Sequence, residues 1–77
     1  MAKAEIGNHI RRLRFEHDEM TQQALANRVG CTRQTIVLLE QGRYSPSLAL
    51  AFRIAEDFGK TVDEVFQYYG EAEGEGD

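Results

Sequence analysis

The sequence predicts an all-α fold of five short helices, and three observations lead to this prediction. Apolar residues recur three and four positions apart, which is the spacing of helices that bury one face. Capping residues and glycines stand where successive helices would begin and end. An apolar content of 42%, with four phenylalanines, suffices for one compact core in a single domain of 77 residues.

The boundaries of the helices follow from these start and stop signals. The expected helices are, in order, about 6–17, 22–29, 33–41, 48–58 and 62–66. The capping residues are Thr21, Thr32, Ser47 and Thr61, and the glycines that end a helix are Gly30, Gly42 and Gly59. The motif TVDE at 61–64 is a capping box, because Glu64 can bond back to the Thr61 backbone.

The C-terminal residues are less regular. The segment FQYY at 66–69 either continues the last helix or forms a short strand paired with residues 1–5, and the composition leaves both open. The final GEAEGEGD has no apolar residue beyond Ala72 and is expected to be a disordered acidic tail over 70–77. The folded domain is therefore expected to span residues 1–69.

Charge is distributed unevenly along the chain, which has a formal net charge of −4. Residues 1–53 carry eight basic and five acidic side chains, whereas residues 54–77 carry one basic and eight acidic. Between residues 20 and 55 the only acid is Glu40. A local cationic surface within an acidic chain is a weak indication of nucleic-acid binding.

The cellular compartment is predicted from what the sequence lacks. A single cysteine excludes an intrachain disulfide framework and fits a reducing, intracellular environment. No apolar run approaches the roughly 20 residues that a membrane span requires, and the first residues lack a signal-peptide pattern. The chain is expected to be cytoplasmic, with no membrane partner.

Residues 22–41 follow the plan of two helices joined by a tight turn. Gly30 stands where the chain needs a positive φ, and Ala26 is small where the helices would cross closely. This spacing is that of a helix-turn-helix. The residues that would pack between its two helices are Leu25, Ala26, Val29, Cys31, Ile36 and Leu39.

The second helix of this motif has a free face suited to DNA bases. At 100° per residue the face carries Arg33, Gln34, Val37 and Gln41, with Thr32 at its tip and Leu38 at its rim. Arginine can bond O6 and N7 of guanine, glutamine can bond N6 and N7 of adenine, and Val37 or Leu38 can meet a thymine methyl. The side chains placed to hold phosphates on either side are Gln22, Thr32, Arg43 and Tyr44. A solvated helix face is the competing interpretation, and it weakens when the whole array is considered.

The segment 21–66, TQQALANRVGCTRQTIVLLEQGRYSPSLALAFRIAEDFGKTVDEVF, resembles the Cro/cI (Xre-type) helix-turn-helix family. It is especially similar to minimal single-domain members, including the cytolysin-operon repressors. The resemblance covers about residues 6–67 and implies a five-helix lambda-repressor-like domain, a homodimer and a palindromic operator. It implies DNA contact at Gln22, Thr32, Arg33 and Gln34, with Arg43 beside the exit loop.

The resemblance also bears on two structural features. It implies an ion pair between Arg14 and Glu40 that ties the first helix to the third, so that the lone acid faces inward. It favours a strand over a helix at FQYY, because the chain ends of minimal members pair as a small β-ribbon. The sequence departs from the family in the turn EHDEM at 16–20, which is one residue longer than usual.

The remaining candidate residues are better explained by packing than by chemistry. Cys31 is interpreted as a small packed side chain rather than a redox sensor, and His9 and His17 lack a third metal ligand. No nucleophile–base pair or phosphate-cradling loop is present, so neither an enzyme nor a cofactor or small-molecule ligand is expected. The apolar residues expected to form the core, with one end continuing into a dimer interface beside Tyr68 and Tyr69, are Phe52, Ile54, Ala55, Phe58, Val62, Val65 and Phe66.

The sequence is compatible with two functions of different classes. The leading hypothesis is a dimeric, sequence-specific DNA-binding regulator that represses by occluding a promoter. The alternative is an antitoxin or coactivator-type module that uses the same fold to bind another protein. The short polar tail lacks the apolar anchors with which such a module would clamp its partner, and this favours the DNA-binding hypothesis.

Overall fold

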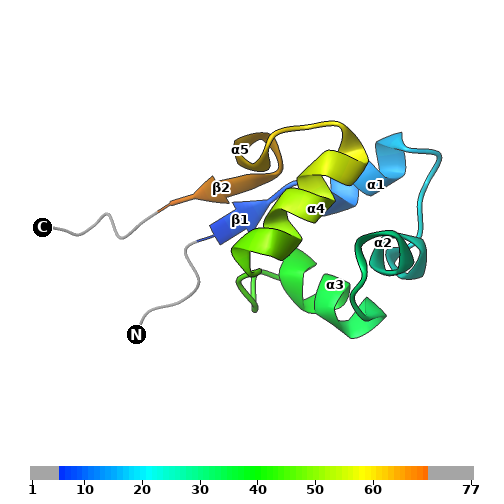
Figure 1. The fold of residues 1–77 in the computed structure, drawn as a ribbon, viewed down its shortest axis with the longest axis horizontal. Helices are drawn as coiled ribbons and strands as arrows, with labels where there is room; N and C mark the ends of the chain where they lie inside the picture. The colour runs from blue at the N-terminus through cyan, green and yellow to red at the C-terminus, as the bar shows by residue number, and fades with distance from the viewer. Residues whose placement is uncertain (1–5, 70–77) are drawn as a thin grey trace, which may run out of the picture.

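The computed structural model describes residues 6–69, and within that range it has five helices and a two-stranded antiparallel ribbon. The elements in chain order are β1 (Ile6–Asn8), α1 (Ile10–Glu16), α2 (Gln22–Val29), α3 (Arg33–Glu40), α4 (Leu48–Phe58), α5 (Val62–Val65) and β2 (Phe66–Tyr68). Figure 1 shows α4 crossing the middle of the molecule, with α2 and the ribbon at opposite ends. The predicted five-helix fold is confirmed. The acidic tail predicted for 70–77 lies outside the described residues.

Every helix contributes an aliphatic side chain to one shared core. The largest fully buried side chains are Ile10 of α1, Leu25 of α2, Ile36 and Leu39 of α3, Ile54 of α4 and Val65 of α5. All buried residues in the range 6–69 are apolar, so the polar side chains lie at the edges of this core. Burying one large aliphatic side chain stabilises a fold by roughly 1.5–3 kcal/mol. The core therefore fixes how α3 packs against its neighbours.

Phe52 belongs to the cluster predicted to be mostly core, with one end continuing into a dimer interface. Phe52 itself is not part of the core, because 57% of its surface is exposed. Phe52 lies one turn after Leu48 on α4, and Leu48 is also exposed. These two side chains form an apolar stripe on the opposite side of α4 from Ile54, whose side chain fills the core.

The first helix begins later than predicted, at Ile10 rather than about Ile6. Residues Ile6–Asn8 form β1, which pairs with β2 so that Asn8 lies opposite Phe66. The predicted partner of the C-terminal strand, residues 1–5, is therefore wrong, and the fifth helix ends at Val65. The Asn8 side-chain Oδ1 accepts a hydrogen bond from the Ile10 backbone N–H at 3.0 Å, so it satisfies the first N–H group of α1. Ile6 has the helical spacing of Ile10, so periodicity alone could not separate them.

The predicted starts of α2, α3, α4 and α5 are confirmed by their capping bonds. The hydroxyl oxygens of Thr21, Thr32 and Ser47 accept the backbone N–H three residues on, at 2.9, 3.2 and 3.1 Å. At α5 the Glu64 carboxylate accepts from the Thr61 backbone N–H at 2.9 Å, as the capping-box motif indicated.

The turn after α1 contains two residues in a strained backbone conformation. Asp18 and Glu19 have φ angles of 61° and 54°, in the left-handed region. The turn is closed by hydrogen bonds from the Glu19 N–H to the Phe15 carbonyl at 3.0 Å and from the Met20 N–H to the Arg14 carbonyl at 2.8 Å. A residue with a Cβ atom pays roughly 1–2 kcal/mol for this conformation.

Glu19→Gly is therefore expected to raise the free energy of unfolding by about 0.5–1 kcal/mol, because glycine relieves the strain but adds backbone entropy to the unfolded chain. Urea denaturation measures the change. The matched control is Glu56→Gly at an exposed position inside α4, where we expect a loss of about 1 kcal/mol. Equal losses at both positions would show that residue 19 carries no strain.

Candidate nucleic-acid interface

The turn between α2 and α3 holds the two helices in a fixed relation. Gly30 has φ 80°, and the N–H groups of Gly30 and Cys31 both donate to the Ala26 carbonyl, at 2.9 and 3.0 Å. The Arg53 guanidinium of α4 donates to the Val29 carbonyl at 2.9 Å and so satisfies the end of α2. Because Ala26 is fully buried, α2 and α3 can cross closely over its small side chain.

The ends of α3 are also fixed by local bonds. At its start the Thr32 hydroxyl caps the helix, as described above. At its end Gly42 has φ 72° and donates its N–H to the Leu39 carbonyl at 3.0 Å, while the Arg43 N–H donates to the Leu38 carbonyl at 2.9 Å. This pair of bonds is a Schellman motif, which reverses the chain beside the helix. The exit loop thereby starts against the last turn of α3.

The face of α3 predicted to read bases is divided between exposed and half-buried residues. Arg33, Gln34 and Gln41 are exposed, together with Thr32 at the tip. Val37 and Leu38 are half-buried, so their methyl groups protrude less than the neighbouring polar side chains and form an apolar part of this face. The exposed polar atoms are therefore free to bind a ligand that lies along α3.

A depression of about 650 Å³ adjoins this face, between α1, α2 and α3. Its lining includes the predicted residues Gln22, Arg33, Val37 and Gln41, and also Arg11 of α1. The sequence reasoning missed Arg11. A signal was available, because Arg11 stands three residues before Arg14 and therefore shares its side of α1.

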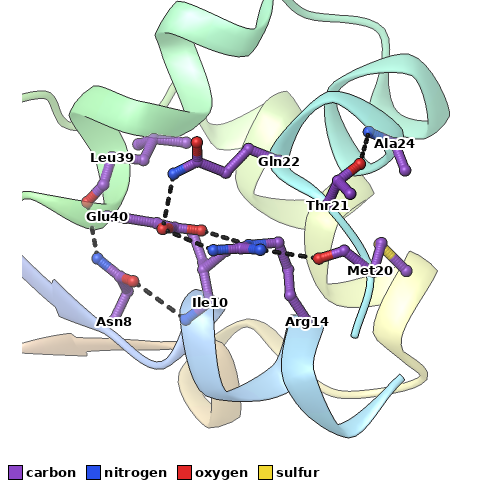
Figure 2. A network of polar contacts seen from close by, with 9 residues as sticks. All are labelled: Asn8, Ile10, Arg14, Met20, Thr21, Gln22, Ala24, Leu39 and Glu40. Carbon is purple, nitrogen blue, oxygen red and sulfur yellow. Dashed lines mark hydrogen bonds and ion pairs between the residues drawn. The ribbon is translucent and has the colours of Figure 1, made fainter. Parts of the chain in front are cut away.

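Glu40 also lines this depression, and its carboxylate lies at the centre of a polar network (Figure 2). Arg14 binds it through two bonds, Nε to Oε2 at 2.6 Å and Nη2 to Oε1 at 3.1 Å. Gln22 Nε2 also donates to Oε1 at 3.1 Å, and Arg14 Nη1 donates to the Met20 carbonyl at 2.7 Å. The Arg14 and Glu40 side chains are only 15% and 10% exposed. The network therefore joins α1, α2 and α3 in a largely water-excluded position.

Gln22 consequently has a different position from the one predicted for it. It was expected to hold a phosphate at the start of α2, but its amide group is half-buried and points to Glu40. An amide nitrogen carries two hydrogens, and this bond uses one of them. Gln22 can therefore support Glu40 and still donate once to a group that lies in the depression.

The network neutralises the negative charge of Glu40 beside the exposed face of α3. Arg14 compensates the charge of Glu40, the only acid between residues 20 and 55. Arg11, Arg33 and Arg43 are exposed and form no ion pair within the described residues. A surface with uncompensated arginines attracts a polyanion. Tyr44, which follows Arg43 in the exit loop, is also exposed and can donate its hydroxyl beside them.

Away from this face, the other titratable candidates have structural roles. Burial raises the pKa of the Cys31 thiol, although the nearby positive charge of Arg53 opposes the shift. Cys31 is thus a neutral side chain packed against the core at neutral pH. The hydrogen bond to Asp57 and the charge of that carboxylate raise the pKa of Arg28, so the guanidinium stays charged. The His17 ring packs edge-on against Phe58 at 5.2 Å between centroids.

Two further findings concern the range 6–69. No group of three or more histidine, cysteine or acidic side chains in this range is arranged to hold a metal ion. The helices found there are also too short or too polar to cross a membrane.

Two helices joined at Gly30, with an exposed polar face on the second, define a helix-turn-helix DNA-binding domain of transcriptional regulators. The helix-turn-helix family model (HTH_3) matches residues 10–65. The chain therefore belongs to the Cro/cI-type, or Xre-type, helix-turn-helix family of DNA-binding transcriptional regulators, as its sequence indicated.

Proteins with similar sequences occur in archaea and bacteria. An uncharacterised HTH-type transcriptional regulator of Methanocaldococcus jannaschii is 44% identical over 61 residues, which are 79% of this chain and 91% of that protein. One from Methanothermobacter thermautotrophicus is 58% identical over 48 residues, or 61% of this chain and 70% of that protein. The uncharacterised HTH-type transcriptional regulator YgzD of Bacillus subtilis is 39% identical over 59 residues, covering 77% and 88% of the two chains.

Among solved structures, the clp gene regulator ClgR of Corynebacterium glutamicum has a similar fold. The TM-score is 0.64 at 24% sequence identity, over 71% of this chain. The match spans only 57% of the ClgR chain. This likeness shows a shared fold.

Proposed function

We propose that the chain is a sequence-specific repressor that binds DNA with α3 in the major groove. The observation that carries the proposal is the exposed first turn of α3, where Arg33 and Gln34 stand free while Glu40 is bound inward by Arg14. Arginine and glutamine are the side chains that make bidentate bonds to guanine and adenine. A domain seated in this way across a promoter represses transcription by occlusion.

The residues around α3 have complementary roles in this proposal. Val37 and Leu38 offer methyl groups to thymine, and Gln41 lies farther along the same face. Contacts to phosphate are assigned to side chains on either side of the groove, and these fix the register without reading sequence. The phosphate-binding side chains are Arg11, Gln22, Thr32, Arg43 and Tyr44.

We further propose that the protein binds a palindromic operator as a homodimer. The surface assigned to the second copy is the apolar flank, formed by Ile6, Pro46, Leu48, Ala51, Phe52 and Val62. Leu48 is 71% exposed, and depressions of about 320 and 300 Å³ lie beside it and beside Phe52. A domain this small buries only roughly 60% of its unfolded surface, so association adds apolar burial that it needs. Two copies of α3 roughly 34 Å apart would enter successive major grooves.

Phe52→Glu is expected to raise the dissociation constant of the homodimer about 100-fold, because a carboxylate replaces a large apolar anchor on each side of the interface. Sedimentation equilibrium measures the change. Phe15→Glu is the matched control, since Phe15 is 66% exposed but lies on α1, outside the apolar flank. A Phe52→Glu protein that associates like the wild type would contradict the assigned interface.

Selection from a random-sequence DNA library tests the proposed function without knowledge of the operator. We expect enrichment of an inverted repeat whose half-sites are about 10 base pairs apart. Fluorescence anisotropy should then show tight binding to the selected duplex, weaker binding to a shuffled one, and a steep salt dependence for both. Failure to enrich any motif would contradict sequence-specific binding and would favour a protein-interaction module.

A further inference from the structure

We propose that Asn8 is a positioning residue for α3 and that the ribbon of β1 and β2 sets the orientation of α3 through it. This inference rests on the proposed function, because the consequence is discrimination between DNA sequences. Asn8 lies in β1, outside residues 10–65 that the family model matches. Its side-chain Nδ2 donates to the Leu39 carbonyl in the last turn of α3 at 2.8 Å, across 31 residues of sequence (Figure 2).

The last turn of α3 receives all of the side-chain hydrogen bonds that reach α3 from other elements of the described range. Asn8 binds the Leu39 carbonyl, and Arg14 and Gln22 bind the Glu40 carboxylate. The bonds at the first turn of α3 are local: the Thr35 backbone N–H donates to the Thr32 hydroxyl oxygen, and the hydroxyl groups of Thr32 and Thr35 share a hydrogen bond. Polar contacts from other elements therefore hold α3 at its last turn, whereas the exposed Arg33 and Gln34 lie at its first turn.

Because α3 is held at its last turn, a small tilt there displaces its first turn. Leu39 lies six positions after Arg33, which corresponds to roughly 9 Å along a helix axis. A tilt of about 10° at the last turn would move the first turn by about 1.5 Å, which exceeds the roughly 0.5 Å within which a binding constellation must be held. Removal of one contact at the last turn should therefore disturb base readout more than phosphate contact, which tolerates small displacements.

The position of Asn8 is in turn fixed by the C-terminal strand. Asn8 lies opposite Phe66 in the antiparallel ladder, and the His9 N–H donates to the Val65 carbonyl at 2.9 Å. The other polar atom of the side chain, Oδ1, accepts from the Ile10 N–H. Both functional groups of the amide are thus used, one to start α1 and one to hold α3.

Two substitutions at this position separate the two bonds. Asn8→Asp has the same shape and keeps an oxygen for the Ile10 N–H, but it cannot donate to the Leu39 carbonyl. Asn8→Ala removes both bonds. The control is Thr61→Ala, which removes the hydroxyl that donates to Asp63 Oδ1 at 2.6 Å in the first turn of α5 and should lower stability without touching α3.

The first readout is the ratio of the dissociation constants for a shuffled duplex and a selected duplex, measured on full-length protein at a temperature where every variant is folded. We expect both Asn8 variants to reduce this ratio about tenfold, the effect of one well-made hydrogen bond. Thr61→Ala should lower the melting temperature and leave the ratio unchanged. The added charge of Asn8→Asp weakens binding to both duplexes and therefore cancels in the ratio.

The second readout is amide hydrogen exchange in the free protein. Asn8→Asp should speed exchange at the Gln41, Gly42 and Arg43 amides, which bond within the last turn of α3, and leave the α2 amides unchanged. This measurement tests the link from Asn8 to α3 even if the wild-type protein does not discriminate between DNA sequences, so failure of the proposed function is recognised separately.

The proposal is overturned by either of two results. In one, the Asn8 variants melt earlier but keep the wild-type ratio and exchange pattern, as expected of a residue that contributes only to stability. In the other, Asn8→Ala lowers the ratio but Asn8→Asp does not, which would assign the effect to the bond between Asn8 Oδ1 and the Ile10 N–H.

Discussion

Arg14→Ala is expected to lower the free energy of unfolding by about 3–5 kcal/mol, because it leaves the carboxylate of Glu40 largely buried without its main partner. Within residues 6–69, Gln22 would remain as the only side chain bonded to that carboxylate. The Met20 carbonyl would lose its donor as well. Because small domains are stable by only about 5–15 kcal/mol, urea denaturation should show the loss clearly.

Two comparisons test whether burial causes this effect. Arg28 also binds a carboxylate, that of Asp57, but its side chain is 55% exposed, so Arg28→Ala should cost much less stability than Arg14→Ala. The double variant Arg14→Met, Glu40→Met removes both charges together and should lose less stability than Arg14→Ala alone. If Arg14→Ala were no more damaging than Arg28→Ala, the Arg14–Glu40 pair would contribute no more than an exposed ion pair.

Arg33→Ala is expected to weaken binding to a selected duplex by about 1–3 kcal/mol, or roughly 5- to 150-fold, and to relax the base preference at one position. The physical reason is the loss of two directed bonds to one base. Gln34→Ala should have a similar effect, but with an unchanged salt dependence because glutamine carries no charge. Anisotropy titrations with selected and shuffled duplexes, each over a range of salt concentrations, measure both quantities.

Arg43→Ala is the matched control for this prediction. Both arginines are exposed, so the two variants lose the same charge from the surface of the protein. Arg43 is assigned to phosphate, and its removal should weaken binding to both duplexes equally and reduce the salt slope by about one unit. An Arg33→Ala protein with the same pattern would show that Arg33 contacts the backbone and does not read a base.

Local signals in the sequence determined much of the fold. The starts of α2, α3, α4 and α5 were predicted correctly because a capping hydroxyl or carboxylate bonds to a backbone group only three residues away. The family was also recognisable from the run between Thr21 and Phe66, and the family match confirms it. The residues assigned to DNA contact remain predictions, which the variants above test.

The tertiary structure decided which distant segments meet. Periodicity placed Ile6 in a helix, but pairing with β2 makes it a strand. Only the packing of α1 against α2 and α3 brings Arg11 to the depression beside Arg33, and only the position of α4 leaves Phe52 exposed. These outcomes depend on contacts between residues far apart in sequence, which local propensity does not encode.

The same division applies to the candidate interface. The sequence by itself determined the helix-turn-helix and the polar side chains along one face of α3, since both follow from helical spacing and from Gly30. The folded chain decided that Gln22 turns to Glu40 and that Asn8 reaches the Leu39 carbonyl. Their amide groups could bond to many partners, and the geometry of the assembled helices and ribbon selected these two.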